Sequence, residues 1–209
     1  IPRAIEHKPI MIPMGKIQRR IYDAIEKKYM NDILSSKGNW FKQDLVKARI
    51  FRLMQVATNP NLLKIPLKNF ASIEGFDPSA VAEEDSLISD VLKYAKTEIP
   101  AKFVKARELV EKIINSREKV IVWATCIKNI LDFESYLNQN GILCKTLYGA
   151  TPVEMSCEED DETETREKII SEFHNPDSSF KVIIANPFAV SESISLHKAC
   201  HNAIYMERN

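Results

Sequence analysis

Several features that would point to a self-contained enzyme or to a membrane protein are missing from this chain of 209 residues. There is no G-x-x-x-x-G-K-[ST] phosphate loop, no G-x-G-x-x-G turn after an expected strand and no G-x-S-x-G nucleophile elbow. No apolar run approaches the roughly 18–20 residues that a membrane helix needs, so no membrane partner is expected. We therefore expect no complete catalytic apparatus and no catalytic residue in this chain.

Neither a disulfide framework nor a metal site is indicated by the cysteines. There are four, and none forms a C-x-x-C pair. Three lie in or beside apolar stretches, where a free cysteine behaves as a small buried hydrophobe, which favours a reducing compartment. His197, Cys200 and His201 lie close together in the sequence, but their spacing is not that of a standard zinc site and a partner pair is missing. No metal is predicted.

Basic residues are unevenly distributed, although the formal net charge is zero. Residues 1–60 contain 12 Lys and Arg against 5 Asp and Glu, whereas residues 61–100 contain 4 against 7 and residues 101–209 contain 13 against 17. A localised basic face is typical of phosphate contact, and it is equally typical of a solvated helix surface. The acidic run at residues 158–164 is interpreted as a solvated loop.

The first half, residues 1–98, is predicted to be mainly helical. Isoleucines recur at helical spacing from Ile17 to Ile33. A further helix is expected to end at Asn59, because the residue before a proline is disfavoured in a helix. The expected helices cover residues 17–33, 41–58 and 85–96, and residues 64–86 are expected to be irregular.

The second half alternates between helical and strand patterns, which predicts an α/β fold with a parallel sheet and helices on both faces. Ligands of such sheets bind beyond the carboxyl ends of the strands, so the loops after Ala124, Leu147, Ala185 and Met206 are the candidate site. The expected helices cover residues 100–115, 127–139 and 165–174, a short loop and helix are expected over residues 187–200, and the expected strands cover residues 119–124, 142–147, 180–185 and 203–206.

A series of short motifs occurs in one order along the chain. It comprises Gln18 with Tyr22, Leu53–Leu63, Ile99–Lys102, Lys119–Thr125, Leu147–Ala150, Arg166 with Phe173, and Val182–Leu196. In this order the motifs resemble the second motor lobe of Swi/Snf-type superfamily two ATPases, over nearly the whole chain. The resemblance implies a RecA-like helicase C-terminal lobe at residues 99–209, preceded by a helical protrusion leading into the lobe at residues 1–98.

The same resemblance implies an ATPase that works with two lobes. The N-terminal lobe of the same polypeptide would bind ATP and Mg, and double-stranded DNA would be the other partner, with no cofactor expected on residues 1–209. The family's arginine fingers lie in a Q-x-x-x-R-x-x-R motif after the final strand. Since Asn209 precedes that motif, we expect a lobe truncated before its last motif and inactive by itself.

Site residues follow from the motif positions. The resemblance implies DNA-backbone contacts from Thr125, Lys128, Asn186 and Ser191, and an ATP-facing cleft lined by Glu192, Ser193 and Ser195. Alternatives stay open: Thr125 as the N-cap of the helix starting at Ile127, Lys128 as plain helix surface, and the serines as loop and helix caps. Arg166 is expected to order the sheet edge. The serines also depart from the family's pattern, because Ser191 and Ser193 replace glycines and Ser195 replaces an asparagine.

Two other hypotheses remain. The altered fifth motif favours a non-catalytic module that binds nucleic acid or protein with a degenerate helicase fold. A strand-separating helicase is disfavoured by the segment Asn59–Leu63, which belongs to the Swi/Snf insertion. The expected location is the bacterial cytoplasm, or the nucleus if the source is eukaryotic.

Overall fold

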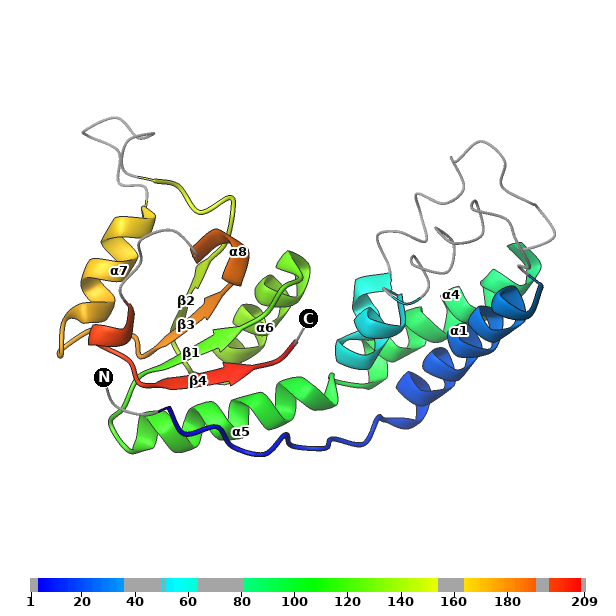
Figure 1. The fold of residues 1–209 in the computed structure, drawn as a ribbon, viewed down its shortest axis with the longest axis horizontal. Helices are drawn as coiled ribbons and strands as arrows, with labels where there is room; N and C mark the ends of the chain where they lie inside the picture. The colour runs from blue at the N-terminus through cyan, green and yellow to red at the C-terminus, as the bar shows by residue number, and fades with distance from the viewer. Residues whose placement is uncertain are drawn as a thin grey trace. The chain divides into compact units, whose positions relative to one another are not determined.

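The computed structural model describes residues 4–35, 50, 52–63, 81–153, 164–190 and 196–207. The chain divides into two compact units, Ile1–Lys102 and Phe103–Asn209, which are coloured from blue to green and from green to red in Figure 1. The predicted boundary, between residues 98 and 99, lies just before this division. The functional roles of the two halves stay predictions, because this division reflects only how compact each unit is.

The first unit is built from helices. Helix α1 (Lys16–Ser35) lies against α4 (Val81–Thr97), and the 3-10 helix η1 (Pro60–Leu63) contacts α4 as well. The isoleucine spacing that predicted α1 places its apolar side chains on one face, as expected for a helix of 3.6 residues per turn. The buried core of the unit consists of Ile17, Ile21, Ile25, Val56, Leu63, Val91 and Tyr94.

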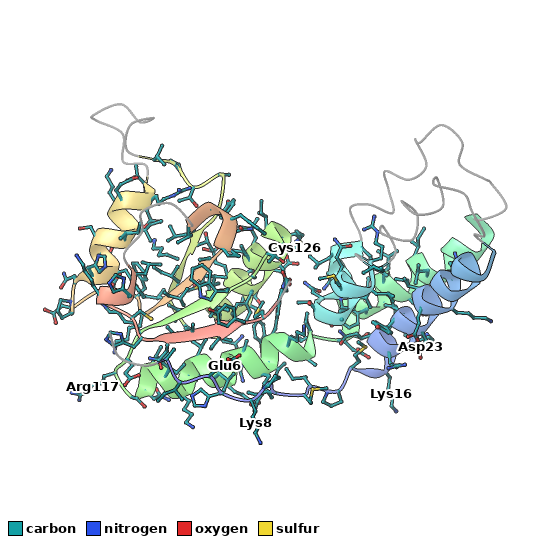
Figure 2. All side chains as sticks on the ribbon, viewed as in Figure 1. Glu6, Lys8, Lys16, Asp23, Arg117 and Cys126 are labelled. Atoms are coloured by element: carbon teal, nitrogen blue, oxygen red, sulfur yellow. The ribbon has the colours of Figure 1, made fainter. Side chains whose placement is uncertain are left out.

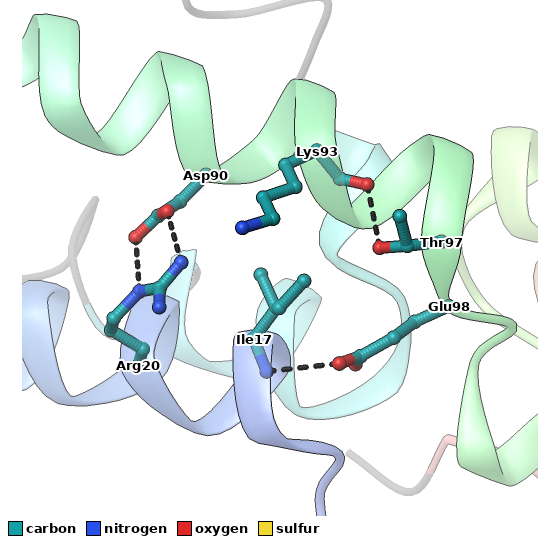
Figure 3. Close-up of polar contacts among 6 residues, drawn as sticks. All are labelled: Ile17, Arg20, Asp90, Lys93, Thr97 and Glu98. Atoms are coloured by element: carbon teal, nitrogen blue, oxygen red, sulfur yellow. Dashed lines mark hydrogen bonds and ion pairs between the residues drawn. The ribbon is translucent and has the colours of Figure 1, made fainter.

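Polar contacts join the same two helices at their surface (Figure 3). The Arg20 guanidinium donates two hydrogen bonds to the Asp90 carboxylate, one of them from Nε at 2.6 Å. The backbone N–H of Ile17 donates to Glu98 Oε1 at 3.0 Å. Because this N–H belongs to the first turn of α1, it has no partner within the helix, and Glu98 satisfies it.

One expectation for the first half was wrong, and another lies partly outside the described residues. The prediction of irregular chain up to residue 86 was wrong, because α4 begins at Val81 rather than at Asp85. Ala82, Glu83 and Glu84 favour a helix by propensity. Of the helix predicted at 41–58, residues 50 and 52–58 are described and are helical.

The second unit contains a four-stranded parallel sheet, as predicted. Its spatial order is β2-β3-β1-β4, with Trp123 opposite both Ala185 and Tyr205. Strand β3 is buried along its whole length, while β4 alternates between half-buried and exposed residues. The strands are β1 (Val120–Trp123), β2 (Cys144–Leu147), β3 (Val182–Ala185) and β4 (Asn202–Tyr205).

Helices cover both faces of this sheet, which confirms the predicted layers (Figure 1). Helices α5 (Ala101–Asn115) and α6 (Ile127–Gln139) cover one face. The other face carries α7 (Arg166–His174), α8 (Pro187–Val190) and the 3-10 helix η5 (Leu196–Lys198). Of the short loop and helix predicted over residues 187–200, the structure describes α8 and η5, and residues 191–195 lie outside the description.

Local chemistry accounts for the helix ends in this unit. Gly141 follows α6 with a φ of 75°, a conformation that glycine adopts at low cost. Thr165 is the N-cap of α7, and its hydroxyl accepts from the N–H of Lys168 at 3.3 Å. At the other end of α7, Lys119 Nζ donates to the carbonyls of Phe173 and Asn175. None of the helices in the described part of the chain is long and apolar enough to cross a membrane.

Cys144 on β2 predicts a pH dependence of stability. Its side chain is buried, and burial raises the pKa of the thiol from 9.0 to about 12. The folded protein thus holds this proton more tightly than the unfolded chain does, so the stabilisation is complete below pH 9 and is lost as the pH rises towards 12. We expect a loss of about 1–2 kcal/mol in the free energy of unfolding near pH 10.5.

Urea unfolding at pH 8 and at about pH 10.5 measures this loss, with Cys144→Ala as the control because other groups also titrate in the range. The alanine variant is expected to be less stable at both pH values, but its free energy of unfolding should decrease less between pH 8 and about pH 10.5. Equal alkaline losses in the two proteins would contradict the assignment.

Candidate nucleic-acid interface at the carboxyl edge of the sheet

The carboxyl ends of the parallel strands bring three loop residues together. Thr125 follows β1, Asn186 follows β3 and Glu207 follows β4. Cys126, next to Thr125, is labelled at this edge in Figure 2. The loops predicted as the candidate site therefore meet at one edge, where side chains from distant parts of the sequence form hydrogen bonds.

Glu207 accepts hydrogen bonds from most of the donors in the loop between β1 and α6. Its Oε2 accepts from the backbone N–H of Thr125 at 2.7 Å, from the backbone N–H of Cys126 at 3.0 Å and from the Thr125 hydroxyl. Its Oε1 accepts from Asn129 Nδ2 at 2.7 Å. A carboxylate thus occupies the N-terminal end of α6, where unpaired N–H groups and the helix dipole favour negative charge.

The alternative interpretation of Thr125 as an N-cap was wrong. Cys126 is the N-cap of α6 and makes no capping hydrogen bond with its side chain, while its backbone N–H donates to Glu207, which follows β4. Burial raises the pKa of the Cys126 thiol, and the nearby Glu207 charge adds to the effect. The DNA contact of Thr125 stays a prediction, and its two donors are engaged by Glu207.

Asn186 holds the loops after β1 and β3 together. Its side-chain Nδ2 donates to the carbonyl of Thr125 at 2.9 Å, and its Oδ1 accepts from the N–H of Phe188 at 2.9 Å. The side chain is 7% exposed. The structure therefore gives Asn186 a role in shaping the loop that carries Thr125, and its predicted DNA contact is untested.

The remaining predicted residues divide into two groups. Lys128, which is largely exposed on α6, forms an ion pair with Asp132 one turn further along the helix. Arg166 donates to the carbonyl of Ala189 at 3.0 Å and to that of Tyr148 at 3.5 Å, so it orders the sheet edge as expected. Four predicted residues lie outside the described chain: Ser191, Glu192, Ser193 and Ser195.

Basic residues on α1 are partly neutralised. Arg19 pairs with Asp23 at 2.7 Å and Arg20 pairs with Asp90. Gln18, which was part of the motif series, is buried and donates to the carbonyl of Val56 at 2.8 Å. The basic excess of the first 60 residues is therefore not simply a free cationic face on this helix.

In the cysteine and histidine cluster near the end of the chain, Cys200 is buried, whereas His197 and His201 are exposed. Cys200 is buried against the second face of the sheet and donates weakly to the carbonyl of Asn202 at 3.3 Å. Among the residues that the structure describes, no three His, Cys, Asp or Glu side chains gather closely enough to hold a metal ion.

Glu207 is the residue that sequence reasoning missed. A signal was present, because the family that the motifs resemble has a strand ending in an acidic residue at this point of the series. The sequence did not show which donors that carboxylate would meet, since Thr125 and Glu207 are separated by 82 residues.

Solved structures share this fold. The C-terminal domain of the Sulfolobus solfataricus SWI2/SNF2 ATPase has a TM-score of 0.63 at 18% identity, over 95% of this chain and 70% of that one. The C-terminal part of the Fun30 ATPase domain has a TM-score of 0.62 at 18% identity, over 96% of this chain and 74% of that one. The Pyrococcus furiosus Hef helicase domain has a TM-score of 0.62 at 12% identity, over 99% of this chain and 56% of that one. No protein-family model and no curated protein matches the sequence.

The chain therefore has the RecA-like fold of the helicase-like C-terminal lobe found in Swi2/Snf2-type ATPases. The predicted fold class is confirmed.

Proposed function

We propose that this chain is the second motor lobe of a DNA-dependent ATPase that translocates on double-stranded DNA, and that it is inactive by itself. The fold shared with the C-terminal lobe of SWI2/SNF2 ATPases is the observation that supports this proposal. The N-terminal lobe of the same polypeptide would hold ATP and Mg, because no phosphate loop occurs in these 209 residues. A bacterial cytoplasm is the proposed setting, or a nucleus for a eukaryotic source.

At the carboxyl edge, the proposed DNA contact uses the loop between β1 and α6. Thr125 offers a hydroxyl and a backbone N–H, and Cys126 offers a second N–H at the start of the helix. Donors of this kind bind phosphate oxygens without reading bases. The expected binding is independent of sequence and weakens as salt rises, because bound phosphates release their counterions.

ATP hydrolysis tests the motor proposal in a polypeptide that carries both lobes and the arginine motif that the family resemblance implies. We expect hydrolysis to be slow without nucleic acid, and to be stimulated strongly by duplex DNA and weakly by single-stranded DNA. The 209-residue chain serves as a control and is expected to hydrolyse no ATP. A folded two-lobe protein that hydrolyses no ATP under any of these conditions would rule out the motor.

A second candidate is a non-catalytic module that binds nucleic acid or protein. The engagement of Thr125 by Glu207 and of Arg20 by Asp90 favours the protein-binding form of such a module, because both contacts occupy groups that a DNA phosphate would use. Duplex binding by the two-lobe protein without any ATP hydrolysis would support this candidate.

A further inference from the structure

The Glu207 carboxylate accepts hydrogen bonds from the same donors that the proposed DNA contact needs. The Glu207 side chain accepts from the backbone N–H groups of Thr125 and Cys126, from the Thr125 hydroxyl and from the Asn129 amide. Asn129 is fully buried, so its amide cannot reach bulk water for another partner. Three of these four hydrogen bonds reach Oε2 and one reaches Oε1, so both oxygens of the carboxylate are engaged.

A DNA phosphate and Glu207 cannot use these donors together. Both are anionic acceptors, so a phosphate oxygen approaching Thr125 would meet a like charge and donors that are already paired. We propose that Glu207 is an intramolecular competitor that keeps the loop between β1 and α6 closed to phosphate until its carboxylate is displaced. This inference rests on the proposed function and adds the regulation of the same site.

The surroundings of Glu207 allow its side chain to leave without unravelling the strand. The residue before it, Met206, is buried and its N–H donates to the carbonyl of Trp123 at 3.0 Å. The backbone is thus anchored to β1 at Met206, whereas Glu207 is half-buried and held in the loop through its side chain. Rotation of that side chain exposes the N–H groups of Thr125 and Cys126 while β4 stays in place.

Binding of a short fluorescein-labelled DNA duplex, followed by fluorescence anisotropy, tests the competition in the 209-residue chain. Glu207→Gln removes the charge while keeping the shape of the side chain, and we expect it to bind the duplex about tenfold more tightly. Glu111→Gln is the matched control, because it removes the same charge from the exposed face of α5, where Glu111 pairs with Arg107. We expect this control to change binding by less than about twofold.

Nuclear magnetic resonance with inorganic phosphate separates this inference from the proposed function. In Glu207→Gln we expect phosphate to shift the amide resonances of Thr125 and Cys126, and in the unaltered chain we expect no shift at those positions. If neither protein binds duplex but phosphate still distinguishes them in this way, the DNA proposal fails and the competition stands.

Two results would overturn the inference. One is equal duplex binding by the unaltered chain and Glu207→Gln. The other, in proteins that bind no duplex, is a phosphate titration that affects both alike or neither. If Glu207→Gln fails to fold by circular dichroism, Asn129→Ala replaces it. That variant removes the hydrogen-bond donor to Glu207 Oε1 and leaves Thr125 unaltered. Because the carboxylate is then held by fewer hydrogen bonds, we expect a smaller gain in duplex binding than for Glu207→Gln. No gain would overturn the inference.

Discussion

Replacing Phe133 with alanine is expected to lower the free energy of unfolding of the sheet unit by about 3–5 kcal/mol. Phe133 lies on α6, is completely buried, and packs its ring 5.0 Å from that of Phe103 on α5. Alanine would leave a cavity between the two helices and the sheet, and the rigid β-strands beneath allow little collapse. Among the single changes considered, this one has the largest expected effect on stability.

Phe188→Ala is the matched control, because this phenylalanine on α8 is 73% exposed and its loss is expected to cost less than about 1 kcal/mol. Urea unfolding monitored by tryptophan fluorescence measures both. The chain has two tryptophans, so a Trp40→Phe background makes Trp123 on β1 the reporter of the sheet unit. Similar losses from Phe133→Ala and Phe188→Ala would contradict the packing described for this face.

Asn186→Ala is expected to destabilise the same unit by about 2–3 kcal/mol. The substitution removes the donor to the Thr125 carbonyl and the acceptor of the Phe188 N–H at a site that is 7% exposed. Both backbone groups would lose a partner where water has limited access. Leaving a buried donor or acceptor without a partner costs more free energy than a typical hydrogen bond contributes to stability.

The same fluorescence assay measures this change, with Asn140→Ala as the control. Asn140 is exposed at the end of α6 and donates to the Tyr136 carbonyl at 2.7 Å, and water can replace that bond. We expect the control to lose less than about 1 kcal/mol. If the two variants prove equally stable, Asn186 does not hold the two loops together as the hydrogen bonds indicate.

Much of the second unit was predictable because its determinants are local. The boundaries of α6 agree with the apolar spacing from Ile127 and with the stop at Asn140-Gly141, where a positive φ suits glycine. Buried parallel strands are short runs of β-branched residues, and β3 is such a run. The first unit was less predictable, because the start of α4 at Val81 follows a segment whose prolines and glycine obscured the helical pattern.

The sequence by itself determined the alternation of helices and strands, the layers that follow from it and the edge of the sheet where a site would lie. Only the tertiary structure decided which groups meet at that edge. Glu207 reaches Thr125 across 82 residues, and Asn186 reaches it across 61. The physical reason is that periodicity records which face of an element is apolar, whereas the partner of a polar side chain depends on the order and register of the strands.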